Sequence, residues 1–200
     1  MIVEPEEALL ASYRTPGQYV EMRAGGETGF FVLSNEPGSP VWELVMRAGG
    51  GASDVVLAMP TGSAGPDIEL TGAIGHGFPV EAAAGHPLVV ALNGTGVAAG
   101  PPLVRRRIRD GDASRTKVFV GVRARDEVPI DDELQRWRSQ GVDVVVCLSQ
   151  ELQDAVRVRL SPGELAGGHV FAVGSSPMID SLRALAPHLG LDALRIHTNY

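Results

Sequence analysis

The chain has 200 residues, which is room for one large domain or two small ones. Its hydrophobic content of 44% and charged content of 20% are those of an ordinary globular protein. The net charge of −7 excludes a broad electrostatic grip on nucleic acid, and the single cysteine excludes a disulfide framework and any multi-cysteine metal or iron–sulfur site.

The first part of the chain, residues 1–82, predicts a small antiparallel β-barrel. Its apolar runs are short and are separated by Gly and Pro, a pattern typical of antiparallel strands. Residues 53–59 predict one short helix, with Ser53 as its N-cap and Gly62 beyond its end. The predicted strands cover residues 18–22, 29–33, 41–46 and 68–70.

Residues 86–200 predict a second domain, in which apolar strands alternate with helices. This alternation is typical of βαβ units and therefore of a parallel sheet covered on both faces. The predicted strands are 88–92, 117–122, 142–148, 169–173 and 194–197, and the predicted helices are 102–109, 131–140 and 177–189. The weakly polar residues 77–87 predict a linker. The expected fold class is α/β plus β, an antiparallel barrel followed by an α/β nucleotide-binding domain.

Several other residues favour structural roles. The arginines at positions 105–107 and 109 are expected at a solvated helix end, because short charge runs commonly face solvent. Cys147 lies in an apolar run, which predicts a buried, inert thiol. Trp42 and Trp137 are expected in the core or at the domain interface. The five histidines lack metal-binding spacing, so no metal site is expected.

Two glycine-rich turns are the candidate ligand-binding features. Residues 93–99 and residues 174–178 each follow an apolar strand and precede a helix. Ligands of parallel α/β sheets bind at the carboxyl ends of the strands, where glycines let backbone N–H groups approach a phosphate. A single Gly-x-Gly turn is equally compatible with a tight turn that binds nothing. Two such turns on one sheet predict a crevice lined by backbone donors.

These turns belong to a series of segments that resembles the ferredoxin–NADP reductase superfamily. The segment 93–99 is similar to that family's nicotinamide loop, GGTGIAP, and 171–178 is similar to its later Cys-Gly-Pro segment. The order and spacing hold over almost the whole chain. The matching segments are residues 16–20 (PGQYV), 51–53 (GAS), 75–78 (GHGF), 93–99 (NGTGVAA), 121–123 (GVR), 132–134 (DEL) and 171–178 (FAVGSSPM), with Tyr200 at the end.

The resemblance implies a flavin-binding barrel followed by a nicotinamide-binding domain. The protein would then be an oxidoreductase that moves electrons between NAD(P)H and a flavin, FAD. For Ser53 a plain helix N-cap, and for Tyr200 a surface aromatic, remain alternatives to a cofactor contact. The residues implied to bind cofactor are Leu33, Ser34, Gly51, Ser53, Gly94, Thr95, Gly96, Arg123, Gly174, Met178 and Tyr200.

The resemblance also assigns roles within the nicotinamide site. Residues 94–96 would hold the pyrophosphate, and Arg123 or Arg125 would contact the adenosine ribose or a 2′-phosphate. Family members that select NADP often follow the third strand with Ser-Arg, whereas residues 149–150 here are Ser-Gln. This difference favours NAD over NADP.

Departures from the family pattern fall on residues that carry the chemistry. Phe31 and Leu33 stand where the flavin motif has Arg and Tyr, and Val173 stands where the family has Cys; Ser34 is retained. A lost Arg–phosphate contact weakens flavin binding, because such contacts are charge-assisted. The alternative function is therefore a redox-inactive family member, acting as a nucleotide-sensing or protein-binding subunit.

The remaining expectations concern partners and location. The short N-terminal part predicts an incomplete barrel, whose exposed edge would bind a protein partner or a second copy of the chain. No apolar run approaches the roughly 18 residues of a membrane span. The N-terminus lacks the pattern of a signal peptide, so a cytoplasmic location is expected, with neither membrane nor nucleic acid as a partner.

Overall fold

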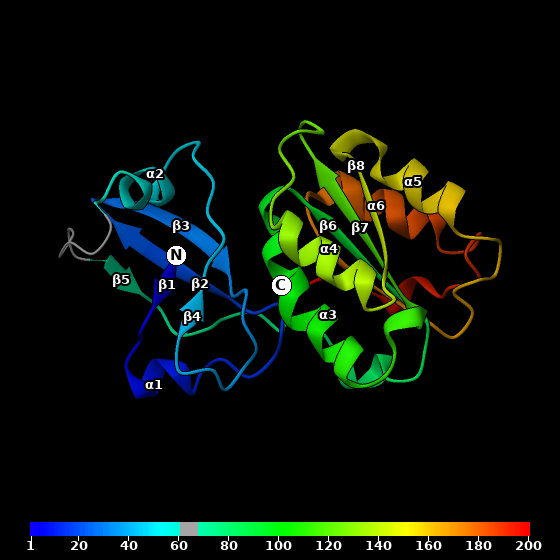
Figure 1. Ribbon diagram of the computed structural model, residues 1–200, viewed down its shortest axis with the longest axis horizontal. Helices are drawn as coiled ribbons and strands as arrows, with labels where there is room; N and C mark the ends of the chain where they lie inside the picture. Colours follow the sequence, from blue (N-terminus) through cyan, green and yellow to red (C-terminus); the bar gives the residue numbers. More distant parts are fainter. Residues whose placement is uncertain (61–67) are drawn as a thin grey trace.

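A computed structural model describes residues 1–60 and 68–200 of the chain. An antiparallel, barrel-like part and an α/β part lie side by side, in the predicted order (Figure 1). Gly62, expected beyond the end of a helix, lies outside the described residues. Among the helices of the described segments, none is long and apolar enough to cross a membrane.

The barrel-like part consists of two small antiparallel sheets. One has the strand order β3-β2-β5, and the other pairs β1 with β4. A bridge between Leu33 and Leu44 connects the two sheets, and Leu33 and Trp42 are fully buried between them. The elements are β1 (Ile2–Val3), α1 (Glu7–Leu10), β2 (Tyr19–Ala24), β3 (Glu27–Val32), β4 (Trp42–Glu43), α2 (Ala52–Leu57) and β5 (Ile68–Leu70).

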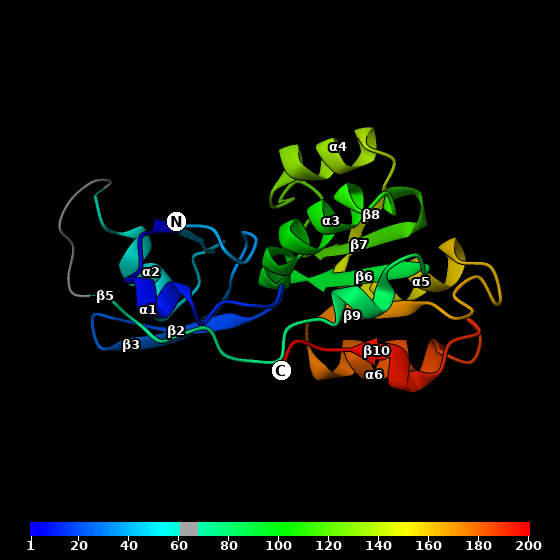
Figure 2. The same ribbon diagram turned by 90° about the horizontal axis from the view of Figure 1, so that it is seen from below.

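The α/β part is built on a five-stranded parallel sheet with the order β10-β9-β6-β7-β8. Helices α3 and α4 cover one face, and α5 and α6 cover the other (Figure 2). The elements are β6 (Leu88–Asn93), α3 (Gly100–Arg109), β7 (Thr116–Val122), α4 (Asp131–Ser139), β8 (Asp143–Leu148), α5 (Leu152–Arg159), β9 (His169–Val173), α6 (Ser176–Leu185) and β10 (Ile196–His197). The predicted fold class is confirmed.

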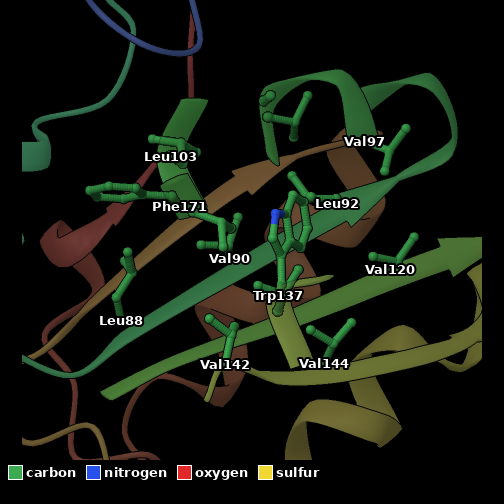
Figure 3. Close-up of a cluster of buried hydrophobic side chains, with 14 of the residues drawn as sticks. Leu88, Val90, Leu92, Val97, Leu103, Val120, Trp137, Val142, Val144 and Phe171 are labelled. Carbon is green, nitrogen blue, oxygen red and sulfur yellow. The ribbon is translucent and has the colours of Figure 1, made fainter. Parts of the chain in front are cut away.

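Alternate residues of β6 are buried in two separate cores. Leu88, Val90 and Leu92 face α3 and α4, whereas Val89 and Ala91 face α5 and α6. Figure 3 shows the ring of Trp137, from α4, beside Leu92 and Val90 in the first core. Because both faces of the strand are covered, its sequence is apolar throughout.

The sheet reverses its direction of growth at β6. The chain adds β7 and β8 on one side of β6 and then returns to add β9 and β10 on the other. Leu92, at the end of β6, therefore pairs with Val173, at the end of β9. The glycine turns that follow these two strands lie next to each other at this switch point, which is where ligands of open α/β sheets bind.

Local structure corrects three sequence predictions. Helix α2 starts at Ala52 with Gly51 in the N-cap position, and the Ser53 hydroxyl donates to the carbonyl of Gly50 at 2.8 Å. The prediction of Ser53 as N-cap is therefore wrong. The last long helix, α6, ends at Leu185 rather than residue 189, and α5 was not predicted at all.

Arg107 contradicts the prediction of a solvated arginine cluster, because its side chain is 1% exposed. Its guanidinium pairs with Asp112 at 2.9 Å and donates to the hydroxyl of Thr116 at 3.0 Å. It also donates to the carbonyls of Ala83 and His86, in the segment that joins the two parts of the chain. Arg107 thus fixes this segment onto α3.

We expect Arg107→Met to lower the free energy of unfolding by about 3–5 kcal/mol, because the substitution removes the cation that faces the largely buried Asp112 carboxylate and the side-chain donor to the carbonyls of Ala83 and His86. Arg109→Met is the matched control. Arg109 is exposed and pairs with Glu36 at the surface, so its loss should cost less than about 1 kcal/mol. Denaturant unfolding measures both, and equal small effects would contradict the role of Arg107.

A pair of histidines, His169 on β9 and His197 on β10, joins these two neighbouring strands at one edge of the parallel sheet. Nδ1 of His169 and Nε2 of His197 are 3.0 Å apart, and the Nε2 atom of His169 is 3.4 Å from the guanidinium of Arg195. Burial, followed by the positive neighbours His197, Arg195 and His86, lowers the pKa of His169 from 6.5 to about 4. The pKa of His197 is lowered too, chiefly by burial and then by Arg195.

These shifts predict a pH-dependent stability. Because the native state binds fewer protons than the unfolded state between about pH 6.5 and 4, the free energy of unfolding should fall as the pH falls through this window. His169→Phe should flatten the dependence, whereas His188→Gln, at an exposed histidine, should leave it unchanged. Denaturant unfolding at pH 7 and pH 5 measures both. A wild-type stability equal at the two pH values would refute the prediction.

Candidate functional site

A cavity of about 600 Å³ lies between the barrel-like part and the carboxyl edge of the parallel sheet. The sheet contributes the turns that follow β6, β7, β8 and β9. The barrel-like part contributes β3 and the segment 47–53 at the start of α2. The cavity is therefore at the switch point and has walls from both parts of the chain.

The two glycine turns pack directly against each other. A Cβ atom on Gly96 would lie 2.8 Å from the carbonyl oxygen of Val173, and one on Gly174 would lie 3.1 Å from Cβ of Asn93. Gly94 has φ +59°, a conformation that favours glycine. The first turn is a 3₁₀ helix (Gly94–Ala99) that continues into α3. The start of a helical segment presents N–H groups without internal partners, which favour a negative ligand.

Asn93 and Ser149 connect the ends of β6 and β8 across β7. The Ser149 hydroxyl donates to Oδ1 of Asn93 at 2.6 Å. A Cβ atom on Gly121, in the intervening strand, would lie 3.1 Å from that oxygen and 3.2 Å from Cα of Ser149. Glycine at position 121 leaves room for this contact, which fixes the floor of the cavity.

Two arginines lie on opposite walls of the cavity. Arg47 comes from the barrel-like part and Arg123 follows β7. Both side chains are exposed, and both also line an adjoining cavity of about 260 Å³. Among the arginines and lysines of the described residues, these are the two side chains that have neither an acidic nor a carbonyl partner.

An aromatic slot of about 310 Å³ adjoins the main cavity and shares Phe30, Val32 and Val173 with it. The rings of Tyr19 and Phe30 meet edge to face at 6.0 Å, on one side of the slot. Tyr200 lines it too and is 59% exposed. The preceding residue, Asn199, is buried and donates to the carbonyl of Gly17 at 2.9 Å, which anchors the end of the chain across the two parts.

The structure brings about half of the sequence-predicted site residues to one cavity. Those lining it are Ser53, Gly94, Thr95, Gly96, Arg123 and Gly174, and Tyr200 lines the adjoining slot. Gly51 and Met178 lie close to the cavity without lining it. Ser34 is buried and lines a separate groove between the two parts.

The residues of β3 that line the cavity are not the ones that the resemblance to the flavin motif implies. Leu33, aligned with the flavin-stacking Tyr, is fully buried in the barrel core and lines none of these cavities. Phe30 and Val32 line both the cavity and the slot. Phe31, between them, lines the main cavity too, so positions 30–32 all reach it and Leu33 does not. Positions 30–33 are all apolar, so the sequence gives no signal for which of them line the cavity.

Sequence reasoning also missed Arg47, and it interpreted Asn93 only as a replaced glycine. The contact of Asn93 with Ser149 joins two strand ends that are far apart in the sequence. The available signal for Arg47 was its position in the segment MRAGGGAS, just before the glycines that precede α2.

The chain joins a barrel-like part to a parallel sheet that has glycine turns at its switch point, which is a two-part architecture. No protein-family model and no curated protein sequence matches the chain. Solved structures do match. The cytochrome P450 reductase GcoB from Amycolatopsis superposes with a TM-score of 0.75 at 25% identity, over 93% of this chain and 60% of that one.

Two further structures agree. A ferredoxin–NADP⁺ reductase from Plasmodium falciparum gives a TM-score of 0.72 at 15% identity, over 92% of this chain and 82% of that one. The flavohem-like FAD/NAD-binding domain of a nitric oxide dioxygenase from Vibrio cholerae gives 0.68 at 19% identity, over 92% and 84%. The chain has the fold of the ferredoxin–NADP reductase superfamily, which confirms the resemblance, and it spans about 60% of the length of the Amycolatopsis reductase.

The contact between the glycine turns can be tested by Gly96→Ala. The added methyl would collide with the backbone of Val173, so we expect the free energy of unfolding to fall by about 1–3 kcal/mol. Ser176→Ala, at an exposed position on the neighbouring turn, should change it by less than about 0.5 kcal/mol. Denaturant unfolding measures both, and a fully stable Gly96→Ala variant would show that the turns are not packed this closely.

Proposed function

We propose that the chain binds a flavin and a nicotinamide dinucleotide and transfers electrons between them. The observation that carries this proposal is the aromatic slot that opens into a glycine-lined cavity bearing two unpaired cations. Similar structures support it, because they include a cytochrome P450 reductase, a ferredoxin–NADP⁺ reductase and an FAD/NAD-binding domain.

The residues of the slot fit a flavin ring. An isoalloxazine is flat and aromatic, and the slot offers Tyr19 and Phe30 together with Tyr200. The aromatic side chain that the motif lacks at Leu33 is thus replaced by others on neighbouring strands. A bound flavin would supply the electron-transfer chemistry, while the protein positions it and excludes water.

The turns of the α/β part would hold the nicotinamide dinucleotide. Gly94, Thr95 and Gly96 would approach the pyrophosphate, and Gly174 would leave room for the nicotinamide end. Val173 lines both the cavity and the slot, so it would lie between the two cofactors as an apolar wall. It offers no thiol and therefore supports hydride transfer only by packing.

We also propose NAD rather than NADP as the nicotinamide substrate. Arg125 pairs with Glu151 at 3.2 Å, close to the end of β8 and to Ser149 in the cavity wall. An acidic side chain at the end of a strand suits a ribose 2′-hydroxyl and repels a 2′-phosphate. Pairing with Glu151 also withdraws one cation that a 2′-phosphate would otherwise use.

A redox-inactive, nucleotide-binding subunit is the second candidate. The observation that favours it is the free outer edge of β3. Within the described residues, β3 pairs only with β2, and Phe30 on β3 is 65% exposed. Such an edge would bind a protein partner or a second copy of the chain. In this case the nucleotide would be sensed rather than oxidised.

Absorbance spectroscopy separates the two candidates. The purified chain, mixed with excess FAD and desalted, should retain a yellow flavin spectrum that NADH bleaches without oxygen. Bleaching by NADPH should be slower at equal concentration. A protein that binds NADH but retains neither FAD nor FMN would support the sensing subunit, and one that binds no dinucleotide would refute both candidates.

A further inference from the structure

The charge distribution around the main cavity differs from that of the whole chain. The chain has a net charge of −7, yet no acidic side chain is found among the described residues that line the cavity. Its two charged lining residues are Arg47 and Arg123. One carboxylate, Glu127, lines the smaller adjoining cavity. The larger cavity is therefore a local concentration of positive charge in an acidic protein.

Arg47 and Arg123 also lack carboxylate and carbonyl partners. Within residues 1–60 and 68–200, each of the other arginine and lysine side chains pairs with a carboxylate or a backbone carbonyl. Arg105 pairs with Glu133 at 2.8 Å, for example, and Arg195 donates to the carbonyl of Gly167 at 2.7 Å. Two like charges beside one cavity repel each other unless an anion lies between them. Their arrangement suits an anionic ligand.

The two arginines come from different parts of the molecule. Arg47 follows β4 and precedes the glycines at positions 49–51 that lead into α2, whereas Arg123 follows β7 of the parallel sheet. Gly94 and Thr95 line both cavities together with them. An anion bound by both guanidinium groups would thus contact the barrel-like part and the α/β part at the same time.

We propose that Arg47 and Arg123 clamp the diphosphate of a bound dinucleotide between the two parts of the chain. The inference rests on the proposed function, since it takes a dinucleotide as the occupant. Guanidinium groups bind phosphate oxygens through paired, charge-assisted hydrogen bonds, and a diphosphate offers enough oxygens for two of them. Arg47 thereby supplies the charge that the flavin motif lacks at Phe31.

The clamp explains how the cavity can still bind phosphate although the arginine of the flavin motif is replaced by Phe31. Phe31 lines the cavity and carries no charge, while Arg47 reaches the same cavity from the segment that follows β4. The hydroxyl of Thr95 lies in the same lining and provides a neutral donor for one of the remaining oxygens. Recognition of the phosphates would then be shared between the two walls instead of belonging to the barrel alone.

The test compares Arg47→Gln and Arg123→Gln with the wild-type chain by calorimetric titration. The probes are FAD, NADH, ADP and inorganic pyrophosphate, with riboflavin as the probe that lacks phosphate. Each substitution should weaken ADP, pyrophosphate and one dinucleotide by about 10–100-fold, and should leave riboflavin unchanged. The dinucleotide that loses affinity in both variants, FAD or NADH, identifies which cofactor the clamp holds.

Arg157→Gln is the matched control, because Arg157 is exposed on α5 and pairs only with Asp154. It should bind every probe like the wild type. Since Arg47 and Arg123 have no partner to lose, their variants should unfold at the wild-type denaturant midpoint. Weaker binding then reports the site rather than a damaged fold.

The outcomes separate the clamp from the proposed function. Dinucleotide binding that survives both substitutions overturns the clamp and leaves the proposed function standing. Binding weakened by Arg123→Gln alone also overturns it, because one wall would then hold the phosphates. If the wild-type chain binds pyrophosphate and ADP through both arginines but retains no flavin, the clamp stands and electron transfer by this chain does not.

Discussion

The buried guanidinium of Arg107 determines how the two parts of the molecule meet. It is removed from water, and its cost of desolvation is offset by one carboxylate, one hydroxyl and two backbone carbonyls. Because the carbonyls of Ala83 and His86 belong to the connecting segment, the entry into β6 is held at a fixed place on α3. The stacked rings of Phe78 and Phe171, 4.9 Å apart, continue this junction toward the sheet.

The cavity depends on that junction, since its walls belong to different parts of the chain. Elsewhere in the described residues the lysine and arginine side chains have carboxylate or carbonyl partners, as Lys117 and Arg159 do in their ion pairs with Asp143. At the cavity the structure leaves Arg47 and Arg123 unpaired. Unpaired like charges contribute nothing to folding, so their presence at this one place is better explained by a ligand than by stability.

The parallel sheet could be predicted from sequence because most of β6 and β7 is buried on both faces, which makes residues 88–92 and 118–122 continuous runs without a polar side chain. Helix α5 was missed for the opposite reason. It buries only Leu152 and Val156, while Val158 is 82% exposed and interrupts any amphipathic pattern. Arg107 could not be distinguished from its exposed neighbours, because burial of an arginine depends on partners that are distant in the sequence.

The site was predictable only where it depends on the backbone. Close contacts require glycine at 96 and 174, and the positive φ at 94 favours it there; such requirements are visible as residue types. The facing of β3 was not predictable, because Phe30 and Leu33 are both apolar and only the packed barrel assigns one of them to the core. The sequence likewise does not single out Arg47. This arginine differs from the others in having no carboxylate or carbonyl partner, and only the folded structure shows that difference.

The position of Tyr200 links the aromatic slot to the same junction. Asn199 is 4% exposed and binds the carbonyl of Gly17, while the backbone of Gly75 packs against it without a side chain. The last strand, β10, pairs with β9 over only two residues, so the anchor at Asn199 does much to hold the end of the chain in place. A ligand lying under Tyr200 would therefore contact both parts of the molecule. Ligand affinity and the docking of the barrel on the α/β part are then coupled, because each stabilises the arrangement that the other needs.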